Sequence, residues 1–284
     1  MNKLFSVLLI AAITAMPACC VSNSTSRSPT GLNMAQHLER QTVAMDEWRG
    51  VVGVDGDGDP IMGIVDPAED PEAELQVYCS GVWVTDDVFV TAQHCVDHLG
   101  KPPLTDEEKM LRSLGIQLPG TVKWDPTGQP LTYSVEGEIV DSPTKIRSTH
   151  TAVVLASDPD HDLALVRVTG DVNDVPKHEN ARLATSVREG DDAHIMGHPG
   201  GLLWSYYRGV VAAIRPHETG PHEVAMDTIQ VSAPVWFGNS GGGAFNQDGQ
   251  LIGIASWIRK IPNVAFFVKF TEVNKLLDAN KIIR

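Results

Sequence analysis

The chain has 284 residues, of which 42% are hydrophobic, and a formal net charge of −14. This acidic balance argues against nucleic-acid binding, which depends on clustered Lys and Arg side chains. The hydrophobic content is sufficient for a buried core, and the length suits one globular unit that follows an N-terminal targeting segment.

Residues 1–19 have the organisation of an export signal. Lys3 supplies a positive charge, and Leu4–Ile13 form an apolar run that is too short to span a bilayer. Cys19 and Cys20 follow, so the segment is either a cleaved secretory signal or a bacterial lipoprotein signal with lipid on Cys19, although Pro17 is unusual in such a motif. We expect an exported protein. It would be periplasmic, attached to the cell envelope by this lipid, or secreted, and it would contact a membrane through this lipid alone.

Residues 20–47 begin with a stretch rich in Ser, Thr and Asn, which indicates a flexible tether. The folded domain is therefore expected over residues 48–284. Asp55-Gly-Asp-Gly-Asp59 has alternating carboxylates that could bind Ca²⁺, but it lacks the full twelve-residue loop and its terminal Glu. A surface turn is the preferred interpretation, and no metal or cofactor is expected.

The remaining sequence has the pattern of many short strands and few helices. One helix is expected from the capping box Thr105-Asp-Glu-Glu108 to about residue 114, and another over residues 272–280 with Thr271 as its cap. Asp248-Gly249 is a tight hairpin turn. Strands are expected over residues 51–54, 82–84, 88–91, 151–156, 163–168, 193–196, 209–214, 228–231, 243–246, 251–257 and 263–270.

Three motifs carry the groups that a catalytic serine requires: the serine itself, a base, and a carboxylate that orients the base. Ser240 lies in Phe237-Gly-Asn-Ser-Gly-Gly-Gly-Ala244, where glycine permits turns that direct backbone N–H groups at one oxyanion. His94 ends an apolar β-type run and can act as a base, and Asp162 precedes another strand and can orient that base. Each has a plainer interpretation, namely a Gly-rich turn, a surface or core histidine and a turn aspartate. Their order along the chain, His94, Asp162 and then Ser240, favours a catalytic role.

These motifs resemble those of the trypsin-like serine proteases with the chymotrypsin fold. Thr91-Ala-Gln-His-Cys95 resembles the family's Thr-Ala-Ala-His-Cys, Asp162-Leu-Ala-Leu165 its Asp-(Ile/Leu)-Ala-Leu, and Gly238–Gly242 its Gly-Asp-Ser-Gly-Gly. The resemblance covers roughly residues 48–279. It implies an all-β fold of two six-stranded antiparallel barrels with a short C-terminal helix, and a disulfide between Cys79 and Cys95 in this exported chain.

The resemblance also implies the roles of the site residues in an endopeptidase that cleaves protein or peptide substrates. Ser240 is the nucleophile, His94 the general base and then acid, and Asp162 the group that orients it. The backbone N–H groups of Gly238 and Ser240 form the oxyanion hole. Four residues are expected to form the substrate pocket, namely Pro234, Ser256, Trp257 and Ile258. None is a carboxylate, so small or medium apolar residues should be preferred.

One departure from the family's motif concerns how the protease is activated. Asn239 stands where digestive members carry an aspartate that pairs with a newly cut N-terminus, and a neutral amide cannot form that ion pair. Gly238–Gly242, together with Ile195–Gly201 and Tyr207–Ala213, resembles the bacterial branch that includes periplasmic quality-control proteases. We expect a member of this non-zymogen branch without a C-terminal peptide-binding domain, because the chain ends shortly after Phe270.

Two other classes of protein fit parts of the pattern. A catalytically silent binding protein on the same fold is one alternative, and the presence of all three catalytic side chains argues against it. An esterase or lipase of another fold is the second. Gly238–Gly242 fits its Gly-x-Ser-x-Gly pattern, but His94 and Asp162 precede the serine, whereas that class has the order Ser, Asp, His.

Overall fold

The structure, a computed structural model, describes residues 33–54, 59–65, 68–101, 125–138, 145–219, 224–259 and 261–283. Four sequence predictions therefore lie outside the described residues. They are the signal segment with Cys19 and Cys20, the first part of the tether, most of the Asp-rich turn at 55–59, and the helix at 105–114.

Six strands form a first antiparallel barrel. The barrel closes because the first and the last strand in the sheet order also pair with each other. In sheet order they are β1 (Thr42–Val54), β3 (Glu74–Trp83), β4 (Val88–Thr91), β7 (Leu163–Val168), β6 (Lys145–Asp158) and β5 (Pro130–Glu138). Trp83, Phe89 and Tyr133 fill its interior and are fully buried. Aromatic rings of this size provide much of the apolar burial that stabilises a small barrel.

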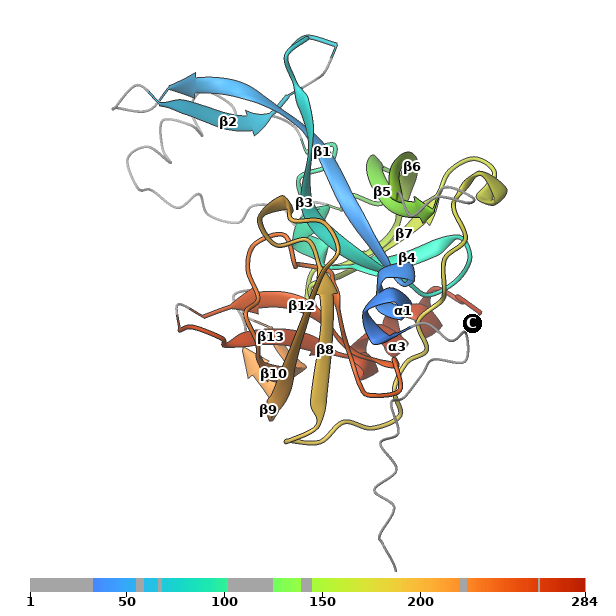
Figure 1. Cartoon of the computed structure of the whole chain (residues 1–284), viewed down its shortest axis with the longest axis vertical. Coiled ribbons are helices and arrows are strands. Elements are labelled where there is room, and N and C mark those ends of the chain that lie inside the picture. Colours follow the sequence, from blue (N-terminus) through green and yellow to red (C-terminus); the bar gives the residue numbers. More distant parts are fainter. Residues whose placement is uncertain are drawn as a thin grey trace, which may run out of the picture.

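A second closed barrel follows in the chain. In sheet order it consists of β10 (Ala225–Ser232), β13 (Ala265–Lys269), β12 (Leu251–Ile258), β11 (Gly243–Phe245), β8 (Asp192–Gly197) and β9 (Ser205–Thr219). Its interior contains Ile195, Ile229 and Phe267. Figure 1 shows the two barrels in contact. The prediction of an all-β fold with two six-stranded barrels is confirmed.

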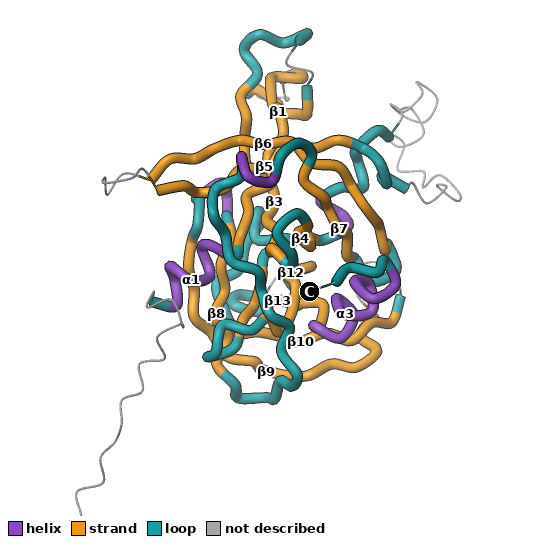
Figure 2. Tube along the Cα trace, turned by 90° about the vertical axis from the view of Figure 1, so that its right-hand side faces the viewer, coloured by secondary structure: helices purple, strands orange, loops and turns teal. Residues whose placement is uncertain are grey.

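Helices are few, as expected. The α-helices are α1 (Met34–Arg40) and α3 (Phe270–Ala279), with short 3-10 turns η1 (Gln93–Cys95), η2 (Val172–Asp174) and η3 (Pro199–Gly201). Strands and loops make up most of the described trace (Figure 2). No helix in the described part of the chain combines the length and apolar character that crossing a bilayer requires.

The expected cap of the C-terminal helix is wrong. The helix begins at Phe270, directly after β13, and its N-cap is Lys269, which makes no side-chain capping bond. Thr271 lies inside the first turn because the strand leads into the helix without a turn between them. Three apolar side chains of this helix, Val273, Leu276 and Leu277, are buried in the core.

The expected tether is too long. The Asn33 and Gln36 side chains form a capping box that starts α1, and β1 begins at Thr42. Leu38, Val43 and Met45 are fully buried in the cores. The Ser- and Thr-rich composition that indicates a tether ends near residue 30, and the folded part of the chain has begun by α1, well before the expected boundary at residue 48.

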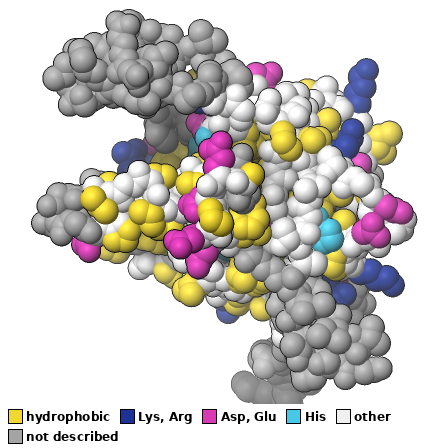
Figure 3. Space-filling model, turned by 90° about the horizontal axis from the view of Figure 1, so that it is seen from above, with side chains coloured by type: hydrophobic (Ala, Val, Ile, Leu, Met, Phe, Trp, Pro, Cys, Tyr) yellow, Lys and Arg dark blue, Asp and Glu magenta, His cyan; other side chains and the backbone are white. Residues whose placement is uncertain are grey.

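The expected strands all overlap observed strands, but two observed strands have no counterpart among them. They are β5 and β2 (Pro60–Ile64), of which β2 pairs with the outer half of β1. The outer end of β1 and its partner extend away from the barrels as a two-stranded arm (Figure 1). Hydrophobic side chains gather on this projecting part (Figure 3), and Val51, Val54 and Ile64 are each more than half exposed. Side chains exposed on both faces give no alternating pattern by which to recognise a strand.

We predict that the fold requires α1 and the inner half of β1. A chain that begins at Trp48 lacks Leu38 and the segment that pairs with both β3 and β5, so it should not form the first barrel. A chain that begins at Leu32 should unfold cooperatively in urea. Leu38→Ala in that longer chain should lower the free energy of unfolding by about 2–5 kcal/mol, because it leaves a cavity in the core.

The matched control is Leu202→Ala, at a side chain that is 66% exposed. It should change the free energy of unfolding by less than about 0.5 kcal/mol. A chain that begins at Trp48 and is as stable as the longer one would contradict the revised boundary.

Candidate active site

Ser240 lies in a tight turn between β10 and β11. Gly238 and Gly241 on either side have φ angles of 95° and 81°, which only glycine adopts readily. A Cβ at Gly238 would lie 2.3 Å from the carbonyl oxygen of His198, so this position also excludes side chains on steric grounds. The turn is closed by hydrogen bonds from the Asn239 N–H to the Trp236 carbonyl at 3.1 Å and from the Gly242 N–H to the Asn239 carbonyl at 2.8 Å.

His94 and Asp162 meet at the ends of neighbouring strands. β4 leads into η1, which carries His94, and Asp162 directly precedes β7, which pairs with β4. The His94 Nδ1 lies 3.0 Å from each oxygen of the Asp162 carboxylate, and the His94 backbone N–H donates to Oδ1 at 3.0 Å. Because the carboxylate holds Nδ1–H, the Nε2 of neutral His94 is the ring nitrogen whose lone pair can accept a proton.

Asp162 is fully buried, and its φ of 51° is unusual for a residue with a side chain. Ser256 on β12 donates its hydroxyl to Oδ2 of the same carboxylate. A buried carboxylate requires such donors, since an unpaired charge in an apolar interior is very costly. Burial by itself lowers the pKa of His94, but the hydrogen bond and charge of Asp162, with a smaller effect of Asp97, outweigh it and raise the pKa above 6.5.

Backbone contacts bring the Ser240 turn next to this pair. The Ser80 N–H donates to the Ser240 carbonyl at 2.8 Å, and the Gly241 N–H donates to the Ala255 carbonyl at 2.8 Å. The expected Cys79–Cys95 disulfide is present, with its Cα atoms 6.2 Å apart. It joins the residue before Ser80 to the residue after His94, so the Ser240 turn and His94 are linked through one short stretch of the first barrel.

Cys79, His94 and Cys95 also offer ligand atoms within 4.8 Å of one another, the one such three-residue group in the described ranges. Joined in a disulfide, the two sulfurs are not thiolates and cannot act as ordinary metal ligands. The geometry of this group therefore fits a disulfide beside a histidine rather than a metal centre.

The residues expected to form the substrate pocket have different surroundings. The Ser256 side chain is bonded to Asp162, so its hydroxyl supports the His94–Asp162 pair rather than the pocket. Trp257 stacks on Phe266 with ring centroids 5.1 Å apart, and Ile258 packs against the core of the second barrel. Pro234 is exposed on the loop after β10. The pocket itself stays a prediction.

Three residues that contact the Ser240 turn are not among the site residues predicted from the sequence. The Ser80 hydroxyl donates to the Gly238 carbonyl at 2.8 Å, and the His198 Nδ1 lies 2.8 Å from that hydroxyl. The Gly200 N–H donates to the Phe237 carbonyl at 2.7 Å. His198-Pro-Gly-Gly201 belongs to a family-like segment of the sequence, but a short motif does not indicate which distant residue its side chain will contact.

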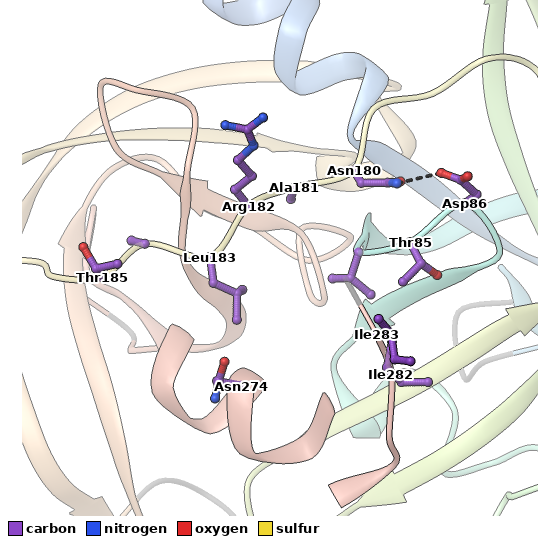
Figure 4. A pocket seen from close by; sticks show the side chains of 12 residues that line it. Thr85, Asp86, Asn180, Ala181, Arg182, Leu183, Thr185, Asn274, Ile282 and Ile283 are labelled. Atoms are coloured by element: carbon purple, nitrogen blue, oxygen red, sulfur yellow. Dashed lines mark hydrogen bonds between the residues drawn. The ribbon is translucent and has the colours of Figure 1, made fainter. Parts of the chain in front are cut away.

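A separate cavity lies away from these residues. It has a volume of about 930 Å³ and is lined by residues 84–86 and 180–185, together with Asn274, Ile282 and Ile283. Figure 4 shows it between the chain that leads to β8 and the C-terminal helix, with Asn180 donating to Asp86 at 2.7 Å across its edge. None of the catalytic candidates lines it.

The fold and the site together define a protein of the serine-peptidase type. Residues 79–254, more than half of the chain, match the family described as trypsin-like peptidase domain. The chain belongs to this family.

Curated relatives that the chain resembles are serine proteases. It is 34% identical over 110 residues to serine protease PepD of Mycobacterium tuberculosis, over 37% of this chain and 23% of PepD. It is 37% identical over 108 residues to mitochondrial serine protease HTRA2 of Bos taurus, over 37% of this chain and 23% of that protein. A probable periplasmic DegP-like serine endoprotease of Brucella suis is 36% identical over 108 residues, or 36% of this chain and 20% of the relative. The alignments thus cover about a quarter or less of each relative.

A solved structure of the HtrA-type protease AlgW with a decapeptide has the same fold. It superposes with a TM-score of 0.57 and 17% identity, over 88% of this chain and 66% of AlgW. At this identity, the likeness shows the fold alone.

We predict that His94 titrates above pH 6.5 and that Asp162 is the cause. In Asp162→Asn the hydrogen bond to a charged carboxylate is lost and burial remains, so the pKa of His94 should fall below 6.5. The measurement is an NMR titration of the His94 ring. Asp158→Asn is the matched control, because Asp158 contacts His161 at 2.8 Å and not His94. An unchanged His94 pKa in Asp162→Asn would contradict the assigned pair.

Proposed function

We propose that this chain is a serine endopeptidase in which Ser240, His94 and Asp162 form the catalytic triad. The observation that carries the proposal is the buried Asp162 carboxylate, which holds Nδ1 of His94 at 3.0 Å and leaves Nε2 to accept a proton. Membership of the trypsin-like peptidase family supports the same assignment.

In the proposed reaction, the Ser240 hydroxyl oxygen attacks the scissile carbonyl carbon while its proton passes to Nε2 of His94. Asp162 stabilises the imidazolium that forms. The negative charge on the carbonyl oxygen is stabilised by the N–H groups of Gly238 and Ser240. The imidazolium then gives its proton to the leaving amine, and a water molecule releases the acyl group from Ser240 in the same way.

We further propose that activity does not require a cut near Val51. Asn239 is fully buried and its neutral side-chain amide donates to the Trp236 carbonyl at 3.2 Å, so it carries no charge for an N-terminal cation to neutralise. Val51 lies within a continuous strand, paired with Met62 on β2. Both features fit a protease that is active without zymogen cleavage.

The proposed substrates are proteins or peptides, reached after export. The periplasmic DegP-like relatives support export, and the AlgW structure, which is of a complex with a decapeptide, supports peptide binding in the same fold. Residues 1–19 would provide the export signal, and Cys19 the site of lipid attachment. This anchor is the one membrane contact that we propose.

We predict that Ser240→Ala folds like the wild type and loses nearly all peptidase activity. His94→Ala should lose activity to within about tenfold of Ser240→Ala, because triad residues act as a unit. A fluorophosphonate probe should label the wild type at Ser240. Ser232→Ala, at an exposed serine on β10, is the matched control and should retain activity and labelling. A wild type that neither cleaves peptides nor reacts with the probe would indicate a silent binding protein.

We predict cleavage after small or medium apolar residues such as Ala, Val and Leu. Pro234, at the expected pocket base, provides no carboxylate for Lys or Arg, and the branched side chain of Ile258 should narrow the entrance. The preference should be graded, because one methylene group in an apolar pocket is worth only about 1–3 kcal/mol. Ile258→Gly should extend cleavage to larger side chains. Dominant cleavage of a peptide library after Lys or Arg would refute the pocket assignment without affecting the triad.

A further inference from the structure

Ser80 contacts the Ser240 turn at two points. Its backbone N–H donates to the Ser240 carbonyl at 2.8 Å, and its hydroxyl donates to the Gly238 carbonyl at 2.8 Å. Ser80 lies on β3 of the first barrel and is fully buried. One buried residue therefore holds the carbonyl groups of both residues whose N–H groups we assign to the oxyanion hole.

His198 determines the direction of the Ser80 hydroxyl. A carbonyl oxygen can only accept, so the single hydroxyl hydrogen of Ser80 belongs to its bond with Gly238. The His198 Nδ1, 2.8 Å from the same hydroxyl oxygen, must then carry a hydrogen and donate it. The His198 ring is fully buried and packs edge-on against Trp204, with centroids 5.3 Å apart. The result is a directed chain of hydrogen bonds from His198 through Ser80 to the Gly238 carbonyl.

This chain of hydrogen bonds constrains a residue that would otherwise rotate freely. Glycine has no Cβ to limit its backbone, so Gly238 needs external contacts to keep its φ of 95°. In a planar trans peptide the C=O and N–H groups point in opposite directions. The Gly200 N–H holds the Phe237 carbonyl at 2.7 Å, which turns the Gly238 N–H to the other side of that peptide. Ser80 and His198 fix the next peptide, between Gly238 and Asn239.

We propose that His198 and Ser80 are positioning residues that hold Gly238 in the orientation required by the oxyanion hole. The inference rests on the proposed serine-protease function. We assign neither residue a contact with the substrate or with the reacting atoms. Their contribution is that the peptide group between Gly238 and Asn239 is held in place before charge develops on the scissile carbonyl. Backbone donors that are oriented in advance in this way are the most effective.

The test compares four variants on a peptide ester and on the thiono ester of the same peptide, in which sulfur replaces the carbonyl oxygen. Ser80→Ala and His198→Phe remove the two donors, and His198→Asn keeps an N–H near the position of Nδ1. Ser205→Ala is the matched control, because its hydroxyl also donates to a carbonyl, that of Leu202 at 3.0 Å.

For the oxygen ester, Ser80→Ala and His198→Phe should lower kcat by about 10- to 100-fold, less than the loss of a whole oxyanion donor, with KM changed by less than about threefold. For the thiono ester the loss should be within about threefold, because sulfur accepts hydrogen bonds poorly and gains little from the hole. His198→Asn should recover most of the kcat lost in His198→Phe. The NMR titration of His94 should be unchanged in all four variants.

An equal loss on both esters, or an unchanged kcat in Ser80→Ala and His198→Phe, would overturn the positioning role while the proposed triad stands. If Ser80→Ala does not fold, the comparison of His198→Phe with His198→Asn decides the matter, since equal activity of these two variants overturns the role. A wild type inert toward the oxygen ester and toward a fluorophosphonate would overturn the proposed function and this inference together.

Discussion

The burial of one carboxylate organises the whole site. Asp162 carries a charge in a place without solvent, so it is tolerable only with donors on several sides. Those donors come from both halves of the molecule. His94 on η1 donates through its ring and its backbone, and Ser256 on β12 of the second barrel donates through its hydroxyl. The carboxylate that orients the base is therefore also a contact between the two barrels.

The surface between the barrels is apolar and continuous with both helices. One cluster of buried side chains contains Val90 and Leu165 of the first barrel and Ile254 and Val268 of the second. Leu38 of α1 and Leu277 of α3 belong to the same cluster. The helices thus stabilise the contact between the barrels, and the polar site lies where the Ser240 turn of the second barrel meets β3 and η1 of the first.

Local sequence is sufficient for the parts of the site that depend on local geometry. The glycines around Ser240 need positive φ angles, and the strands before His94 and after Asp162 have clear apolar runs, so these positions can be read directly. α1 is not predicted if the tether is taken to continue beyond residue 30, where the tether-like composition ends. The cap of α3 is misplaced because a strand leads directly into that helix.

The supporting network cannot be read from sequence for a different reason. Ser80 is separated from His198 by 118 positions and from Gly238 by 158, and no periodicity relates them. Their contact exists only once both barrels have closed and docked. The chemistry-bearing side chains are thus predictable from motifs, whereas the residues that orient backbone groups around them require the tertiary structure.

The most direct test of a preformed catalytic centre at the barrel junction is a crystal structure after reaction with a peptidyl phosphonate. We predict a covalent bond to the Ser240 oxygen and a phosphonyl oxygen within about 2.7–3.1 Å of the N–H groups of Gly238 and Ser240. The bonds from Ser80 to the Gly238 carbonyl and from His94 to Asp162 should be intact. An adduct on another residue, or a Gly238 N–H turned away from the phosphonyl oxygen, would contradict this prediction.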